Sequence, residues 1–258
     1  MLNLNNYNYS HEPFPHVICK NILDDNIYSD LTQNFPNIEL FKDLSLNDKN
    51  KFKKYCLSKR NNNINFSNFI SSNSTYNKFH KYINSQDFKE QLINEFLGHK
   101  LNIDFGIKLK KKNNLKKIIK DLLNLKWPLP EQNFKITMEF SSLPTGGGFL
   151  APHNDGTDKL TSIVIPIINK EEENFFRNGT GSTSLLEIKD KNKIFNVVNN
   201  TYKFDDVNIV KNINFERNNM LIFFKTYNSL HAVYPIEKHE TYLERRSITI
   251  NIEKKYNL

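Results

Sequence analysis

The second half of the sequence constrains the fold most strongly, because it is divided into short apolar runs whose length suits β-strands. From residue 134 onward, runs rich in Val, Ile, Leu and Phe alternate with turns made of Gly, Pro, Asn and Asp. Runs at this spacing, with no helix between most of them, predict an antiparallel sandwich or a double-stranded jelly roll. The predicted strands are 134–143, 149–155, 161–168, 184–188, 194–198, 207–215, 219–226, 231–236 and 245–252.

The first half of the sequence is dominated by helical patterns instead. Apolar residues recur at helical spacing over 23–35 and over 85–98, where Ser85 is in position to cap the helix. A short strand is predicted at 16–19, ahead of both helices. The stretch 37–75 is rich in Asn, Ser and Lys, and we interpret it as an irregular loop.

These patterns predict a fold of the α+β class that is mainly β. We expect a single domain over 1–258, in which 1–130 is a helical support region and 131–258 is the jelly-roll core. The core is predicted to be a cupin-like double-stranded β-helix, with the N-terminal helices packed on one of its sheets. The basic run at 108–117 begins a predicted amphipathic helix with a solvated lysine face.

The composition argues against nucleic acid and membrane partners. The formal net charge is +8, but the basic run contains no aromatic residues on which bases could stack. Two cysteines, Cys19 and Cys56, are too few for a disulfide framework or a cysteine zinc site. We find no apolar signal-peptide core and no run of the ~18 apolar residues that span a bilayer. We therefore expect a cytoplasmic protein.

The motif APHNDGTDKL, at 151–160, contains a candidate metal site. A histidine two residues before an acid is common by chance, but in a strand His153 and Asp155 would point to the same face. A third ligand is available in His231, which begins the predicted strand 231–236. Two histidines and one carboxylate make the facial triad of non-haem Fe(II) oxygenases, which leaves coordination positions open for a co-substrate and oxygen.

A possible anion-binding residue follows in the last predicted strand, which begins RRSITINI. Alternation along this strand places Arg245 and Ser247 on one face, and Arg246 with the isoleucines on the other. The isoleucine face suits packing against the helices, so Arg245 would face the interior, where a guanidinium can bind a carboxylate in bidentate fashion. Because the two arginines are adjacent, Arg246 remains the alternative.

Two features beside the candidate metal site each have two interpretations. The run Gly146–Gly148 lies between two predicted strands, and no Lys-Ser/Thr pair or helix follows it, so it predicts a hairpin turn rather than a phosphate-binding loop. Lys159 lies four residues after Asp155. It would either anchor a substrate or stabilise the loop.

With these motifs the sequence resembles the Fe(II)- and 2-oxoglutarate-dependent dioxygenases, in the prolyl 4-hydroxylase-like branch. The resemblance rests on PHND, SLHAVYPI and RRSI, and on the N-terminal segment PFPHVICKNILDDNIYSDLTQNFP. It implies that His153, Asp155 and His231 bind iron and are the catalytic centre. It also implies that Arg245 and Ser247 bind the distal carboxylate of 2-oxoglutarate. The second arginine of the nucleic-acid demethylase branch is missing from SITINI, which disfavours repair of alkylated bases.

The implied activity is hydroxylation of an unactivated C–H bond with release of succinate and CO2. The implied substrate is a prolyl, amino-acid-like or other small molecule or peptide, and the cofactors are Fe(2+), 2-oxoglutarate and O2, with ascorbate as a candidate reductant. A cupin-type metal-dependent isomerase or lyase, and a non-catalytic jelly-roll binding protein, are the alternatives. Specificity is expected in the segments 37–75 and 169–184. The candidate pocket residues are Phe149, Leu150, Ile163, Ile165 and Phe223.

Overall fold

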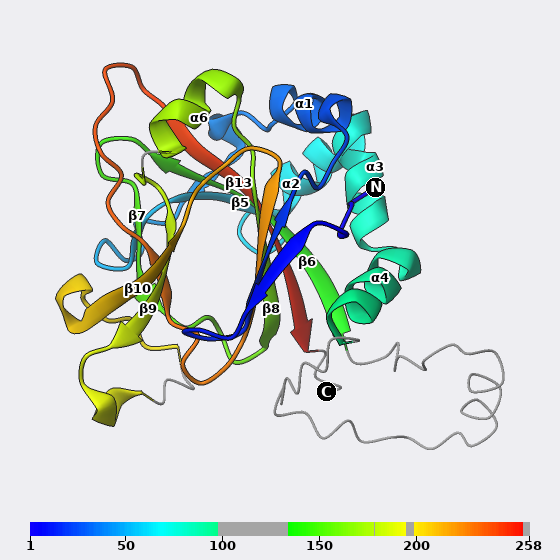
Figure 1. Ribbon diagram of the computed structural model, residues 1–258. Coiled ribbons are helices and arrows are strands. Elements are labelled where there is room, and N and C mark those ends of the chain that lie inside the picture. The colour runs from blue at the N-terminus through cyan, green and yellow to red at the C-terminus, as the bar shows by residue number, and fades with distance from the viewer. Residues whose placement is uncertain (98–133, 178, 195–198, 255–258) are drawn as a thin grey trace, which may run out of the picture.

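The computed structural model describes residues 1–97, 134–177, 179–194 and 199–254. These residues form two antiparallel sheets that face each other, with helices on the outer side of the larger sheet (Figure 1). The larger sheet has eight strands in the order β1-β2-β11-β8-β13-β6-β5-β3, and the smaller has five in the order β10-β9-β12-β7-β4. The strands β6 to β13 are divided between both sheets, as in a jelly roll. The predicted mainly β fold with helices on one sheet is therefore confirmed.

The elements have the following bounds. The strands are β1 (Tyr7–Ser10), β2 (His16–Lys20), β3 (Lys42–Asp43), β4 (Phe52–Lys53), β5 (Tyr55–Ser58), β6 (Phe134–Pro144), β7 (Phe149–His153), β8 (Lys159–Pro166), β9 (Thr183–Ile188), β10 (Val207–Ile213), β11 (Asn219–Phe224), β12 (His231–Val233) and β13 (Glu244–Lys254). The α-helices are α1 (Asp25–Gln33), α2 (Asn63–Ser72), α3 (Ser74–Ile83), α4 (Gln86–Leu97) and α6 (Lys170–Arg177), and three short 3-10 helices are η1 (Ile38–Leu40), η2 (Lys191–Lys193) and η3 (Phe204–Asp206).

Most predicted elements are present, with small differences at their ends. The helices predicted at 23–35 and 85–98 correspond to α1 and α4. The run Gly146–Gly148 forms the predicted turn, in which Gly146 and Gly147 have φ angles of 75° and 111°. The prediction of a hairpin is wrong, because this turn connects β6 of the larger sheet to β7 of the smaller sheet and the two strands do not pair. The predicted basic helix at 108–117 and most of the predicted strand 194–198 lie outside the described residues.

The interpretation of 37–75 as an irregular loop is wrong. This stretch contains β3, β4, β5, α2 and the beginning of α3. Its abundant asparagines cap the helices: the side chain of Asn62 accepts a hydrogen bond from the N–H of Asn65, and that of Asn73 accepts one from Tyr76. The helix propensity of these residues does not predict the helices, because packing of their apolar faces on the sheet is what stabilises them.

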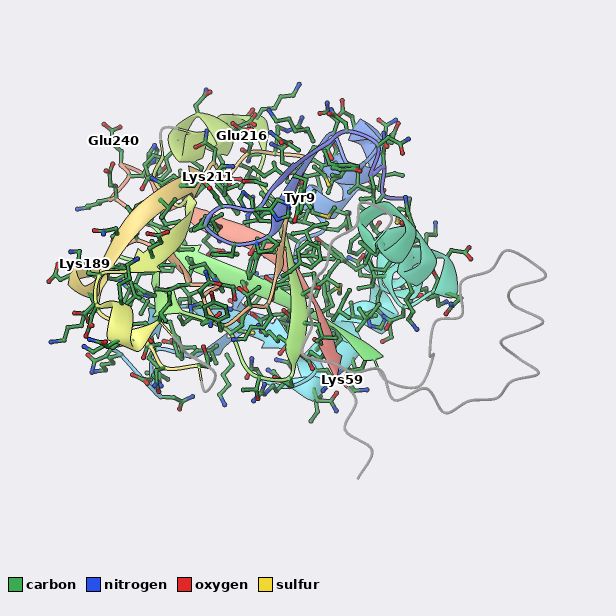
Figure 2. All side chains as sticks on the ribbon, turned by 60° about the horizontal axis from the view of Figure 1, so that its bottom comes forward. Tyr9, Lys59, Lys189, Lys211, Glu216 and Glu240 are labelled. Carbon is green, nitrogen blue, oxygen red and sulfur yellow. The ribbon has the colours of Figure 1, made fainter. Side chains whose placement is uncertain are left out.

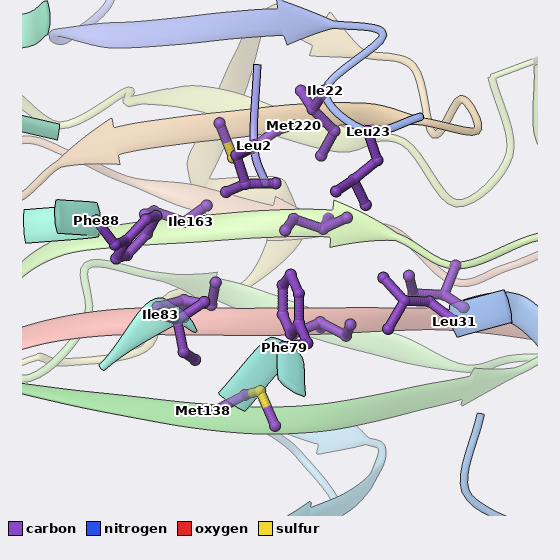
Figure 3. Packing of buried hydrophobic residues seen from close by; sticks show 14 of the residues in the cluster. Leu2, Ile22, Leu23, Leu31, Phe79, Ile83, Phe88, Met138, Ile163 and Met220 are labelled. Carbon is purple, nitrogen blue, oxygen red and sulfur yellow. The ribbon is translucent and has the colours of Figure 1, made fainter. Parts of the chain in front are cut away.

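The main hydrophobic core lies between the helices and the larger sheet. Ile163, Met138 and Met220 project from the sheet toward Phe79 and other helix residues (Figure 3). At its centre, the fully buried ring of Phe140 packs against four other rings, at centroid distances of 5.0 to 6.1 Å. These rings belong to Phe35, Phe66, Phe69 and Tyr76.

The inner face of the larger sheet carries different side chains from its outer face. Along β13, Ile248 and Ile250 belong to the helix-facing core, while Arg245, Ser247 and Asn251 alternate with them and point between the sheets. The same alternation in β8 shows that the prediction of Ile163 and Ile165 as pocket residues is wrong. Ile163 and Ile165 pack in the helix-facing core, because the pleat turns the alternate residues of β8 inward.

The other three predicted pocket residues lie in three different environments. Phe149 contacts Phe204, at 6.2 Å between ring centroids. Leu150 packs against the small buried cluster that contains Leu143 and Val233. Phe223 lies between the sheets, with its ring 4.4 Å from that of His231. Of the predicted set, Phe223 is thus the residue in contact with the candidate metal site.

Charged side chains surround the periphery of the molecule. Lys59, Lys189 and Glu240 are exposed and project outward (Figure 2). Among the described residues, no helix is both long enough and apolar enough to cross a membrane.

Replacing Phe140 by alanine tests the junction between the helices and the larger sheet. Since this ring is fully buried among four aromatic neighbours, we expect Phe140→Ala to lower the free energy of unfolding by about 3–5 kcal/mol. Ile64→Ala is the control, because Ile64 is 72% exposed, and should change it by less than about 0.5 kcal/mol. Urea denaturation measures both, and similar losses in the two variants would contradict this packing.

Candidate metal centre and internal arginine

The backbone pairing of two strands brings the two candidate histidines together. His153 is the last residue of β7 and His231 is the first of β12, and the two are direct partners in the antiparallel ladder. Paired residues point to the same face of a sheet, and their ring centroids are 4.3 Å apart. Both rings project into the space between the sheets, where His231 is buried and contacts Phe223.

Asp155 completes this group from the turn after β7. One carboxylate oxygen, Oδ1, is 3.7 Å from Nε2 of His153, and the other, Oδ2, is 4.0 Å from Nε2 of His231. One ligand atom from each residue can be chosen so that all three lie within 4.8 Å of one another. Metal–ligand distances of ~2.0–2.2 Å place such atoms about 3–4 Å apart. The three predicted ligands therefore lie at the spacing that a single ion requires, after small adjustments.

Hydrogen bonds to the backbone set the tautomer of both histidines. Nδ1 of His153 is 2.9 Å from the carbonyl oxygen of Ala151, and Nδ1 of His231 is 3.0 Å from that of Ser229. Because a carbonyl oxygen only accepts hydrogen bonds, each Nδ1 carries the proton and donates it. Nε2 of each ring is then left with its lone pair directed toward Asp155, as is usual in metal sites.

Asn154 lies between the two candidate ligands of the HND motif. It is fully buried, and its Nδ2 donates to the carbonyl oxygens of Thr226 and Tyr227, at 3.2 and 2.9 Å. Its Oδ1 accepts a hydrogen bond from the hydroxyl of Ser229, whose carbonyl oxygen accepts from His231. Asn154 thus connects the turn that carries Asp155 to the loop that precedes His231. Sequence reasoning missed this role, because the bonded positions are more than 70 residues apart.

Lys225 holds the same turn from another side. Its ammonium group donates to the carbonyl oxygens of Asn154 and Asp155. Burial lowers the pKa of Lys225 to about 8, although the nearby Asp155 carboxylate opposes this shift. Asp155 has a φ angle of 54°, a left-handed conformation that non-glycine residues seldom adopt. The surrounding bonds therefore hold Asp155 in an uncommon backbone conformation that directs its carboxylate toward the histidines.

The carboxylate of Asp155 is surrounded by donors. Lys159 donates to Oδ1 and Ser162 to Oδ2, each at 2.8 Å. Burial alone would raise the pKa of Asp155, but Lys159 and the histidines hold it well below its usual range. Conversely, burial and then the neighbouring His153 lower the pKa of His231 to about 3. At neutral pH the site therefore presents a carboxylate and a neutral His231, which are the forms that bind metals. Lys159 therefore stabilises the loop through Asp155, and its interpretation as a substrate anchor stays a prediction.

Arg245 lies inside the sandwich, as the alternation along β13 predicts. Its Nε donates to the carbonyl oxygen of Gly181 at 2.5 Å, its Nη2 donates to the hydroxyl of Thr183 at 3.1 Å, and the guanidinium stacks 3.9 Å from the ring centre of Phe215. Burial lowers the pKa of Arg245 to about 9. No carboxylate of the described residues lies within ion-pair distance of it. A buried arginine without an acidic partner is a strong indication of an anionic ligand.

Arg246 projects to the opposite side of the sheet. It forms an ion pair with Glu172 of α6 at 2.7 Å and stacks over Phe35. Ser247 is buried on the same face of β13 as Arg245. The geometry therefore favours Arg245 over the alternative Arg246 as an anion-binding residue of the interior.

A cavity of about 200 Å³ opens between the two sheets close to Arg245. Thr183 and Phe215, which both contact Arg245, are among its lining residues. Val164 and Leu221 of the larger sheet line the cavity from the other side. Neither Arg245 nor the three candidate metal ligands line this cavity, so it is adjacent to the surroundings of Arg245 and separate from the candidate metal centre.

Comparisons with known proteins give structural likenesses only. No protein-family model matches the chain, and no curated protein sequence matches it. The fold is similar to that of a Pseudomonas putida prolyl-4-hydroxylase, with 10% identity, coverage of 93% of this chain and 92% of that chain, and a TM-score of 0.48. A prolyl 4-hydroxylase from Phytophthora capsici gives 13% identity, coverage of 93% and 58%, and a TM-score of 0.47.

A third similar structure is HygX from Streptomyces hygroscopicus, which was determined with nickel and 2-oxoglutarate bound. It has 7% identity, coverage of 93% of this chain and 83% of that chain, and a TM-score of 0.46. Likenesses of this size establish neither a family nor an activity for this chain, so its function is inferred from the site itself.

Replacing Asn154 tests whether it positions the metal ligands. We expect Asn154→Ala to weaken binding of a divalent metal by roughly 10–100-fold, the usual effect of removing a supporting contact around a metal site, because the turn at Asp155 and the loop before His231 lose their connection. The exposed Asn192 is the matched control as Asn192→Ala. Calorimetric titration with Co(II) measures both affinities, and unchanged binding in Asn154→Ala would contradict this role.

The low pKa of His231 predicts a pH dependence of stability in the metal-free protein. The pKa is about 3 in the folded chain against a reference of 6.5, so between these values the unfolded state binds more protons and stability falls as the pH falls. We expect the wild type to lose about 1.6 kcal/mol more than His231→Asn between pH 6.5 and 5, because over this range the histidine of the unfolded state goes from half to almost fully protonated while that of the folded state stays neutral. Urea denaturation with a chelator present measures this difference. Equal losses in the two proteins would show that His231 is readily protonated in the folded state.

Proposed function

We propose that this protein is an Fe(II)- and 2-oxoglutarate-dependent dioxygenase of the prolyl 4-hydroxylase-like kind. The observation that carries the proposal is the pairing, in one interior, of a two-histidine, one-carboxylate triad with a buried arginine that has no acidic partner. The triad leaves coordination positions open, and the arginine requires an anion. A dianionic co-substrate that both chelates the metal and binds a guanidinium satisfies both features.

The donor set fits iron better than a structural metal ion. His153 and His231 offer neutral nitrogens and Asp155 offers a carboxylate, and no cysteine of the described chain lies among them. Three ligands on one side of an ion suit a catalytic site rather than a closed tetrahedral one. With Fe(II) and 2-oxoglutarate bound, such a site activates O2 for oxidation of a C–H bond, and the products are succinate, CO2 and a hydroxylated substrate.

The residues of the chain have separate roles in this reaction. His153, Asp155 and His231 hold the metal, and their hydrogen bonds fix the tautomers and the carboxylate orientation. Arg245, with Ser247 beside it, binds the distal carboxylate of 2-oxoglutarate and so orients the molecule. The apolar ring of Phe223 against His231 excludes water from one side of the centre.

The substrate in this proposal is a small molecule or a peptide, of prolyl or amino-acid-like character, and ascorbate is the candidate reductant. We further propose that the chain acts as one catalytic domain in the cytoplasm and without a nucleic acid partner. A cupin-type isomerase or lyase would use the triad but has no need of Arg245, and a non-catalytic binding protein has no need of either. The buried, unpaired guanidinium therefore favours the dioxygenase over both alternatives.

Anaerobic titration with 2-oxoglutarate tests the proposal. Binding to the Fe(II)-loaded wild type should produce a weak visible charge-transfer band, which His153→Ala should lack because a ligand is lost. Arg245→Met should raise the dissociation constant for 2-oxoglutarate by roughly 10–100-fold, as expected for loss of a charge-assisted contact of about 1.5–3 kcal/mol. Arg246→Met removes the same charge from the opposite face and should leave this constant unchanged.

Two results would refute the proposal. One is the absence of the band in the wild type under conditions in which Fe(II) binds stoichiometrically. The other is an equal loss of 2-oxoglutarate affinity in the two arginine variants, because their environments differ while their change in charge is the same.

A further inference from the structure

A second group of charged side chains lies between the sheets, beside the candidate metal centre. Lys54 precedes β5, Glu139 is on β6 and Lys159 begins β8. Lys54 forms an ion pair with Glu139 at 2.5 Å, and Lys159 forms one with Asp155 at 2.8 Å. Their side chains are only 16%, 21% and 25% exposed for Lys54, Glu139 and Lys159 respectively, so these charges are largely withdrawn from water while still open to it on one side.

Lys54 and Glu139 form a charged pair in the folded protein. Burial alone would lower the pKa of Lys54, but Glu139 raises it. Burial would raise the pKa of Glu139, but Lys54 lowers it to about 2. Withdrawing such charges from water is unfavourable, and a packed apolar pair is often as stable as a buried ion pair. Buried ionic groups beside a candidate catalytic centre are therefore candidates for binding.

The charges in this group do not balance once a metal is bound. Asp155 then serves the metal, which leaves two ammonium groups and the single carboxylate of Glu139. An ammonium group has three donors, and among the described residues Lys54 donates to Glu139 and Lys159 donates to Asp155. Glu139 also accepts from Ser141 at 2.9 Å. The group therefore has an excess of positive charge and of hydrogen-bond donors, which suits an anion.

This group is separate from the proposed site for 2-oxoglutarate. In the β6–β13 ladder, Glu139 is opposite Thr249, whereas Arg245 is opposite Leu143. Thr249 is four positions after Arg245 along β13, which corresponds to about 13 Å at ~3.3 Å per residue. Glu139, which the ammonium group of Lys54 contacts, is thus opposite the middle of β13, and Lys159 is opposite Glu253 near its C-terminal end, whereas Arg245 is near its N-terminal end. One dianion that already connects the metal with Arg245 does not occupy both places.

We propose that Lys54 and Lys159 bind a carboxylate group of the substrate, so that the substrate of this site is a small organic acid or an acidic peptide. Glu139 holds the ammonium group of Lys54 in place and competes with the substrate for it. This inference rests on the proposed dioxygenase function. It adds a substrate class, an acid, and a second binding contact beside the metal.

Matched pairs of compounds test the inference in the full chain loaded with Fe(II) and 2-oxoglutarate. The probes are the N-acetyl amino acids, each as its free carboxylate and as its primary amide, and the measurement is the rate of succinate release in air. The uncoupled rate is the rate of succinate release without any added compound. We expect the active compounds to raise succinate release above this rate as free carboxylates, and the matching amides to give an increase at least tenfold smaller. A library in which no carboxylate exceeds its amide would overturn the inference.

Variants then assign the effect to this group. Lys54→Met and Lys159→Met should each raise the KM of the most active acid by tenfold or more. The control is Lys53→Met, which replaces an exposed neighbour and should leave this KM unchanged. Glu139→Gln should lower this KM or leave it unchanged, because it releases Lys54 from its competitor. If the ion pair were purely structural, Lys54→Met and Glu139→Gln would raise the KM of the acid by the same factor. That result would overturn the inference.

The proposed function and this inference fail in different ways. Loss of the anaerobic charge-transfer band with 2-oxoglutarate refutes the dioxygenase. An intact band combined with equal rates for carboxylates and amides refutes only the acidic substrate. Thermal denaturation of each variant shows whether a raised KM is accompanied by loss of folded protein.

Discussion

The pleat of the larger sheet is the constraint on which the rest of the structure depends. Each of its central strands must supply an apolar face to the helices and, one residue later, a side chain to the space between the sheets. In β13 this alternation sends Ile248 and Ile250 to the helices and Arg245 and Asn251 to the interior. A shift of one residue would exchange the two faces. The apolar core therefore fixes which polar groups reach the site.

The three candidate ligands are held by two different means. The strand ladder brings His153 and His231 together, because they are paired residues of β7 and β12, and hydrogen bonds from their Nδ1 atoms to the backbone orient the rings. Asp155 follows the end of β7 and has a left-handed backbone conformation, so the ladder does not orient it. Hydrogen bonds from Asn154 and Lys225 hold this turn to the loop before His231. Two ligands on paired strands and a third on a hydrogen-bonded turn are positioned more reproducibly than three ligands on loops would be.

Periodicity in the sequence predicted those parts of the fold and site that depend on a single strand. The alternation in RRSITINI distinguishes Arg245 from Arg246, and HND followed by His231 identifies the three residues that the fold brings together. Features that depend on contacts between distant segments were not predictable. The helices α2 and α3 were missed because packing on Phe140 and its neighbours stabilises them. Ile163 and Ile165 were misplaced because an apolar run reveals burial but not which face is buried.

The charges of the interior also couple the candidate metal centre to the anion-binding residues around it. Three cations, Lys54, Lys159 and Lys225, are close to the carboxylates of Glu139 and Asp155, and a fourth, Arg245, is buried in the same interior without an acidic partner among the described residues. A divalent metal ion adds to this positive excess, which opposes its own binding, whereas each bound anion reduces the excess. Metal and anion binding in such an interior are therefore coupled, and by linkage each must strengthen the other by the same factor. In the proposed enzyme, 2-oxoglutarate and an acidic substrate would both stabilise the metal, so that the complete centre forms only when its reactants are present.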